Sequence, residues 1–90
     1  MNNKIQTIRL KNVVVLRKTD KNGSFYYIID DKDSNNSYFC FKENIKEGFE
    51  RLAENYEKVK KVQLDYELNT KGRRVVLEID CGIYKVEDFI

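Results

Sequence analysis

The sequence contains no histidine, no tryptophan and no proline, and it has only four glycines and two cysteines. Without histidine, a serine or cysteine nucleophile would lack its usual general base. The four glycines are too widely spaced to form a phosphate-binding loop. Carboxylates are plentiful, but Glu50 and Glu54 fall on the polar face of a predicted helix rather than in contrasting environments. We therefore predict a non-enzymatic protein without a cofactor.

The chain also lacks an apolar run long enough to cross a membrane. Its first residues alternate between polar and apolar instead of forming the core of a signal peptide. We therefore expect a cytoplasmic protein that has no membrane partner. Abundant asparagine, lysine and isoleucine are typical of a low-GC bacterium or of one of its mobile elements.

The two cysteines, Cys40 and Cys81, each fall inside an apolar strand pattern. In that setting a free cysteine packs like a small hydrophobic residue. Since no secretory signal is evident, we expect both thiols to be reduced and to lie in or near the core, with a disulfide as the alternative.

One acidic segment has a partial resemblance to a calcium-binding loop. Asp31, Asp33 and Asn35 match the first three ligand positions of an EF-hand. The match then fails, because Asn36 stands where the sharp turn needs glycine and Lys42 stands where the bidentate glutamate belongs. We therefore predict an acidic turn and no metal site.

Apolar periodicity predicts a single domain that is mainly β, with one helix. A phase slip at residues 11–12 indicates a β-bulge in a long first strand. An amphipathic helix pattern follows the third strand, and a hairpin closes the chain. The predicted elements, in the order β-β-β-α-β-β, cover residues 5–17, 25–29, 38–41, 42–56, 62–68 and 75–79.

This order of elements resembles the OB fold, a curled five-stranded barrel with a helix between its third and fourth strands. The resemblance covers residues 5–80 and rests on element order alone. A small mixed sheet with one packing helix is the structural alternative. We expect residues 1–90 to form one OB-like domain, in which residues 81–90 add an extra strand or a tail.

Strand alternation then predicts which aromatic side chains face solvent, if acidic Asp30 points outward. Residues expected in the core are Phe25, Tyr27, Ile29, Phe39 and Phe41, and those expected to face solvent are Tyr26, Ile28, Tyr38 and Cys40. Tyr26 and Tyr38 would then form a platform on which bases stack. Alternatively, both tyrosines pack half-buried at the rim of the barrel.

Basic residues are unevenly distributed along the chain, although the formal net charge is only +2. Residues 1–19 contain five basic residues and no acid, and both turns that an OB fold uses for nucleic acid are basic. Phosphate contacts respond to such a local potential rather than to the net charge. The residues predicted to contact phosphates are Arg9, Lys11, Lys61, Lys71, Arg73 and Arg74.

The sequence resembles small OB-type single-stranded DNA-binding proteins of phages, plasmids and conjugative elements. The residues that carry this resemblance are Tyr26, Tyr38, the turn at residues 71–74 and the end of the chain at residues 86–90. In that class, an acidic tail containing phenylalanine often recruits partner proteins. Here the tail has two acids and ends in Ile90. The alternative interpretation, which we prefer, is a last strand at residues 83–86.

Two functions follow as expectations. The first is sequence-tolerant binding of single-stranded nucleic acid, with DNA or RNA as the partner. The second is a protein-interaction module or inhibitor from a phage or mobile element, which docks on a host or replication enzyme through the acidic helix face or an exposed strand edge. The sheet edges, or residues 83–90, also offer a route to a homodimer.

Overall fold

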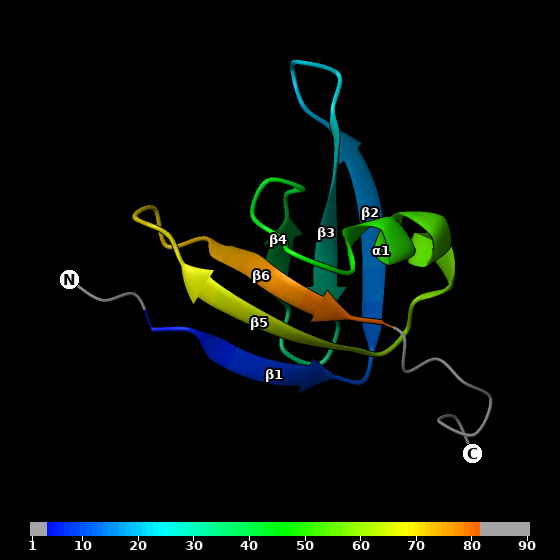
Figure 1. Cartoon of the computed structure of the whole chain (residues 1–90). Coiled ribbons are helices and arrows are strands. Elements are labelled where there is room, and N and C mark those ends of the chain that lie inside the picture. The colour runs from blue at the N-terminus through cyan, green and yellow to red at the C-terminus, as the bar shows by residue number, and fades with distance from the viewer. Residues whose placement is uncertain (1–3, 82–90) are drawn as a thin grey trace.

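The computed structural model describes residues 4–81, which form six strands and one short helical segment (Figure 1). The elements are β1 (Gln6–Leu10), β2 (Val13–Thr19), β3 (Phe25–Asp31), β4 (Asn36–Cys40), α1 (Phe49–Asn55) with a 3-10 turn at Tyr56–Lys58, β5 (Val62–Leu68) and β6 (Arg74–Asp80). The prediction of a mainly β fold with one helix is confirmed. The strand predicted at residues 83–86 lies outside the described residues. No helix within residues 4–81 is long and apolar enough to span a bilayer.

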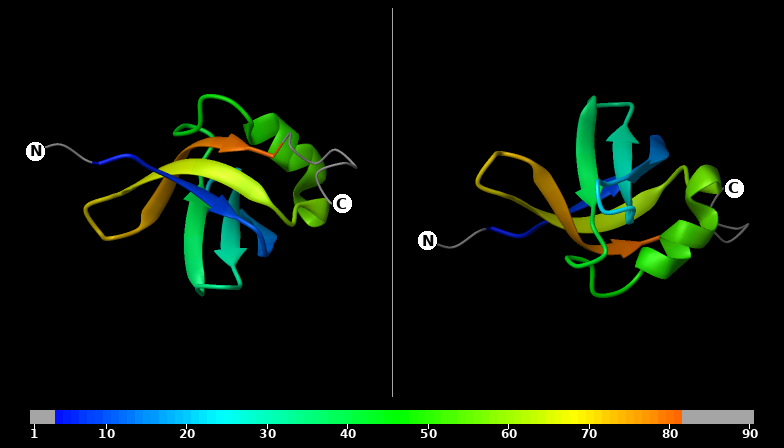
Figure 2. Two further views of the ribbon diagram at one scale, coloured as in Figure 1. Left: turned by 90° about the horizontal axis from the view of Figure 1, so that it is seen from below. Right: turned by 90° about the horizontal axis from the view of Figure 1, so that it is seen from above.

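The six strands form one mixed sheet in the order β1-β5-β6-β4-β3-β2. Neighbouring strands are antiparallel except β4 and β6, which are parallel. The sheet is strongly curved, so that β1, β5 and β6 run across β2, β3 and β4 (Figures 1 and 2). The predicted five-stranded curled barrel is not seen as such, because the sheet has six strands and is open, with β1 and β2 as its two edges.

The two edge strands are consecutive in the sequence and are separated by the bend at residues 11–12. Leu10 and Val13 are buried on either side of this bend, which explains the phase slip in the apolar pattern. The Val13 amide donates a hydrogen bond to the Lys60 carbonyl (3.0 Å), and the Lys32 amide donates one to the Asn12 carbonyl (2.9 Å). These contacts hold the bend against the rest of the sheet, so the predicted long strand is broken in two.

The core lies between the two crossing halves of the sheet, and α1 covers one end of it (Figure 2). Its fully buried side chains include Tyr27, Ile29 and Leu52. Both cysteines are free and buried, as expected for thiols in apolar segments of the sequence. Strand alternation separately assigns Cys40 to the solvent side, and that assignment is wrong, since its side chain has no exposed surface.

The helix begins at Phe49 rather than at residue 42. Gly48, which precedes it, has a positive φ of 92°. A Cβ atom at this position would lie 2.3 Å from the Ile79 carbonyl oxygen of β6. The backbone therefore turns sharply at Gly48, where it passes close to β6. Because this conformation is not helical, residues 42–47 do not join α1 despite their helical spacing.

The last strand contains an irregularity that sequence alternation misses. Asp65 pairs with Glu78 and Tyr66 pairs with Val76, so Leu77 is an extra residue in β6. Val76 is completely buried, whereas Leu77, which simple alternation would put on the same side as the buried residues Val75 and Ile79, is only half-buried. The Leu77 carbonyl instead accepts a hydrogen bond from the Lys46 amide (3.3 Å).

Candidate nucleic-acid interface

Strands β2, β3 and β4 present one side to the core and the other, here called the outward face, to the surroundings. Pairing across the strands forms three rows on this face. From the β2–β3 hairpin inward, the rows are Lys18, Tyr26 and Phe41, then Leu16, Ile28 and Phe39, then Val14, Asp30 and Ser37. The outward face is therefore aromatic at one end and polar at the other.

Three rings, Tyr26, Phe41 and Phe39, form a continuous aromatic row on this face. The ring centroids of Tyr26 and Phe41 are 5.2 Å apart, and those of Phe41 and Phe39 are 6.2 Å apart with nearly parallel planes. All three side chains are half-buried, so each keeps exposed surface. A row of exposed rings is a suitable surface for stacking planar bases.

The prediction that Tyr38 faces solvent is wrong. Its side chain is 1% exposed, and its ring packs edge-on against Tyr66 at 5.0 Å. Burial raises the pKa of the Tyr38 hydroxyl above its ordinary value. Phe39 and Phe41, predicted inside, lie on the outward face instead and take the place expected for Tyr38.

The loop between β3 and β4 explains this exchange. The buried Asp31 carboxylate accepts hydrogen bonds from the Asp33 amide (3.1 Å) and the Ser34 hydroxyl (2.7 Å), and Asn35 takes a positive φ of 63°. This tight loop sets Ile29 opposite Tyr38. Because residues directly opposite each other share a face, Tyr38 follows Ile29 into the core.

The β5–β6 hairpin brings a cation to the aromatic row. The Asn69 side-chain oxygen accepts hydrogen bonds from the amides of Lys71 and Arg73, both at 2.9 Å, and Gly72 supplies a positive φ of 79°. The Arg73 guanidinium then lies 4.6 Å from the centroid of the Phe39 ring. Arg74 contacts the buried Tyr38 ring, at 5.8 Å, from the core side.

The β2–β3 hairpin provides the second basic turn. The Asp20 carboxylate shapes it by accepting hydrogen bonds from the amides of Asn22 (2.8 Å) and Ser24 (2.9 Å). Lys18 pairs with Tyr26 at the aromatic end of the outward face. Its neighbours Arg17 and Lys21 are exposed on the same hairpin.

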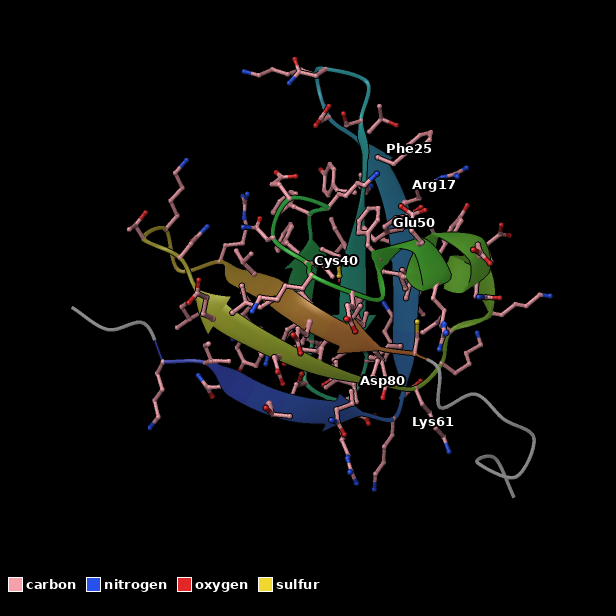
Figure 3. The ribbon with its side chains drawn as sticks, in the orientation of Figure 1. Arg17, Phe25, Cys40, Glu50, Lys61 and Asp80 are labelled. Carbon is pink, nitrogen blue, oxygen red and sulfur yellow. The ribbon has the colours of Figure 1, made fainter. Side chains whose placement is uncertain are left out.

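Phe25, predicted in the core, is 52% exposed. It alternates toward the core side of β3, but it lies at the end of the strand beyond the packed interior. The Arg17 guanidinium stacks on it, 4.6 Å from the ring centroid (Figure 3). Phe25 is therefore a surface aromatic that does not belong to the aromatic row.

The remaining predicted phosphate contacts do not gather on the outward face. Arg9 is in β1, three strands away from β4, and its Nε donates a hydrogen bond to Gln63 Oε1 at 2.8 Å. Lys11 is exposed at the bend between β1 and β2. Lys61 lies at the opposite end of the sheet from Arg17 and Phe25 (Figure 3). Of the predicted residues, Tyr26 and Arg73 therefore contact the aromatic row, Lys71 lies in the same turn as Arg73, and Arg9, Lys11 and Lys61 lie elsewhere.

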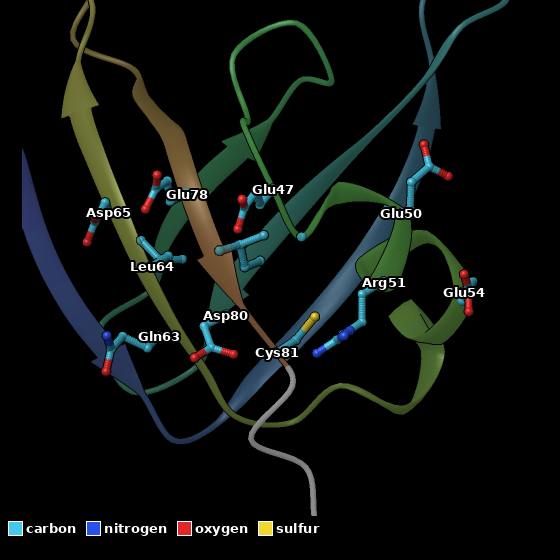
Figure 4. A pocket seen from close by; sticks show the side chains of 12 residues that line it. Glu47, Glu50, Arg51, Glu54, Gln63, Leu64, Asp65, Glu78, Asp80 and Cys81 are labelled. Atoms are coloured by element: carbon cyan, nitrogen blue, oxygen red, sulfur yellow. The ribbon is translucent and has the colours of Figure 1, made fainter.

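A second surface feature is a groove of about 770 Å³ between α1 and the ends of β5 and β6 (Figure 4). Six carboxylates and a single arginine line it, together with Cys81 and other residues; the charged residues are Glu47, Glu50, Arg51, Glu54, Asp65, Glu78 and Asp80. This acidic groove contains much of the negative charge that offsets the basic hairpins.

Within residues 4–81, no three histidine, cysteine or acidic side chains are arranged to hold a metal ion.

Comparisons with known proteins add no functional assignment to these surfaces. No protein-family model, curated protein or solved structure matches this chain. The outward face therefore has to be interpreted from its own geometry, which combines a row of exposed rings, an arginine stacked at the end of that row and two basic hairpins.

Proposed function

We propose that this protein is an OB-type domain that binds single-stranded nucleic acid across its outward face. The OB assignment treats β1 and β2 as one bent strand, which gives five strands with the helix before the fourth. It is supported by the parallel pairing of β4 with β6 and by the two edges being consecutive in sequence. OB domains are partly open barrels that bind ligands on the second and third strands, here β3 and β4.

The observation that carries the proposal is the aromatic row of Tyr26, Phe41 and Phe39, with Arg73 stacked on its last ring. Stacking contributes about 1–3 kcal/mol per engaged base and tolerates any sequence, because every base has a π face. A buried structural cluster would not leave three rings exposed beside each other. A phage, plasmid or other replication context for such binding is part of the same proposal.

Charge supplies the second half of the interaction. The β2–β3 and β5–β6 hairpins flank the outward face. Lys18 and Arg73 lie on this face, and Lys21 and Lys71 are exposed in the two turns, whereas Arg17 and Arg74 lie on the core side. Each phosphate contact to a single strand adds about 0.7 to the slope of log affinity against log salt. The two hairpins would therefore hold the backbone while the rings hold the bases.

The direct test is fluorescence anisotropy with labelled oligonucleotides of about 20 nucleotides at low salt, where electrostatic binding is strongest. Phe39→Ala should weaken binding by about 1–3 kcal/mol without changing the salt slope. Phe25→Ala is the control, because it removes a ring of the same size, and a more exposed one, from the same sheet but from outside the aromatic row. Equal losses in both variants, or no binding by the wild-type protein, would reject the proposal.

The phosphate contacts can be tested in the same titrations. Arg73→Ala should lower the salt slope by about 0.7, whereas Arg9→Ala should leave it unchanged because Arg9 lies away from the outward face. If Arg9→Ala alone lowered the slope, the nucleic acid would follow β1 instead.

A second candidate function is a protein-interaction module, and the acidic groove is the observation that favours it. Six carboxylates around one arginine would attract a basic segment of a partner protein. Copurification with a partner that depends on Glu50 and Glu54, in a protein that fails to bind oligonucleotides, would favour this alternative.

A further inference from the structure

The outward face does not end in an aromatic residue. Beyond Ile28 and Phe39, its last row on β3 and β4 is the pair Asp30 and Ser37. The Ser37 hydroxyl donates a hydrogen bond to Asp30 Oδ1 at 2.6 Å. Both side chains are half-buried, so the pair forms a fixed polar group beside the Phe39 end of the aromatic row.

We propose that Asp30 and Ser37 read the edge of a base stacked on Phe39, and that they favour guanine over thymine or uracil. This inference rests on the proposed function. Diagonal neighbours on an antiparallel pair are about 7–8 Å apart. A base that stacks on the Phe39 ring in place of the Arg73 guanidinium would therefore direct one edge at Asp30. In a single strand this can be the Watson–Crick edge, because the base is unpaired.

The chemistry of the pair determines which edge fits. An ionised carboxylate only accepts hydrogen bonds and has about four acceptor sites, of which Ser37 uses one. The Ser37 proton is committed to Asp30, so its oxygen also presents lone pairs. Guanine is the base whose Watson–Crick edge carries two adjacent donors, N1–H and the 2-amino group, and these match two neighbouring acceptors.

The other bases match less well. Cytosine and adenine each offer one amino donor next to a ring-nitrogen acceptor. Thymine and uracil offer one N–H between two carbonyl oxygens, which would face the carboxylate with like partial charge. A site that contains fixed hydrogen-bonding groups discriminates strongly against a ligand that leaves them unpaired. We therefore expect guanine to bind best and thymine or uracil worst.

The test compares affinities of wild-type protein for alternating 20-mers, which avoid the four-stranded structures of guanine runs. We expect (dT-dG)10 to bind about tenfold more tightly than dT20, with (dT-dC)10 and (dT-dA)10 between them. Hypoxanthine in place of guanine removes the 2-amino group and should lose much of this gain. The base 7-deazaguanine keeps the Watson–Crick edge and should retain it.

Asp30→Asn keeps the shape of the side chain but exchanges one acceptor for a donor, and it should abolish the guanine preference. Asp33→Asn is the matched control, because it removes the same charge from the neighbouring β3–β4 loop without changing the outward face. Equal binding of dT20 and (dT-dG)10 by the wild-type protein would overturn this inference and leave the proposed function intact. Failure to bind any of the oligonucleotides would overturn both.

Discussion

Tyr38 and Phe39 are neighbours in β4, and strand alternation sends them to opposite sides of the sheet. Tyr38 packs in the core against Tyr66, while Phe39 joins the aromatic row beside Phe41. The more polar residue is buried because the register with β3 fixes its position. The cost of burying a tyrosine hydroxyl is offset when it finds a polar partner, and that of Tyr38 is hydrogen-bonded to the Asn36 side chain.

Tyr38→Ala should therefore destabilise the protein, by about 3–5 kcal/mol, because it removes a large side chain from a packed core. Tyr38→Phe keeps the ring and should cost only about 0.5–1.5 kcal/mol for the lost hydrogen bond. Both values can be measured by urea denaturation. A loss below about 1 kcal/mol for Tyr38→Ala would mean that the tyrosine is not part of the core.

Cys40 and Cys81 should be unreactive in the folded protein. Burial raises the pKa of both thiols, and in Cys40 the nearby Cys81 raises it further. Since the thiolate is the reactive form, both cysteines should resist Ellman's reagent at neutral pH and react only as the protein unfolds. Rapid labelling of one thiol per chain without denaturant would contradict the burial of that cysteine.

The helix shows how a distant element sets a local boundary. Residues 42–47 follow the apolar spacing of a helix, yet α1 starts only after Gly48. Gly48 adopts a left-handed conformation that other residues rarely adopt, and it lies directly against the Ile79 backbone. Here a contact between residues far apart in sequence overrides a local helical pattern.

Gly48→Ala should destabilise the fold by about 2–4 kcal/mol, through left-handed strain combined with overlap against β6. A glycine inside a helix would give the opposite sign, because alanine is the better helix former. Gly23→Ala is the matched control: Gly23 also has a positive φ, but a Cβ there would meet nothing within 4 Å. An equal or smaller loss for Gly48→Ala than for Gly23→Ala in thermal melts would contradict the close packing.

The elements that could be predicted are those with an uninterrupted local pattern. Residues 62–68 alternate cleanly, and β5 has these bounds. The extra residue at Leu77 and the helix start at Gly48 could not be read in the same way, because each depends on contact with another element. The face assignment of β4 failed for a related reason, since it depends on the loop capped by Asp31.

At the scale of the whole molecule, the curved sheet places two basic hairpins, which lie far apart in the sequence, at different sides of the outward face (Figure 1). Of the predicted contacts, Tyr26 and Arg73 share the outward face, since the Tyr26 ring packs against Phe41 and the Arg73 guanidinium lies over Phe39. Phe39 and Phe41 were missed because their apolar character indicated the core. Asp31 and Asn35 are the sequence signal for the correct assignment. They indicate a short loop after Asp31, and a loop of that length pairs Tyr38 with Ile29, which puts Tyr38 in the core and Phe39 on the outward face.

The central claim is that single-stranded nucleic acid occupies the outward face, and amide chemical-shift mapping tests it most directly. On titration with an oligonucleotide of about 20 nucleotides at low salt, we expect the largest changes in β3, in β4 and in the β5–β6 hairpin around Arg73. Amides of β1 and of α1 should change little. Changes confined to β1 or to the acidic groove, or no changes at all, would contradict the claim.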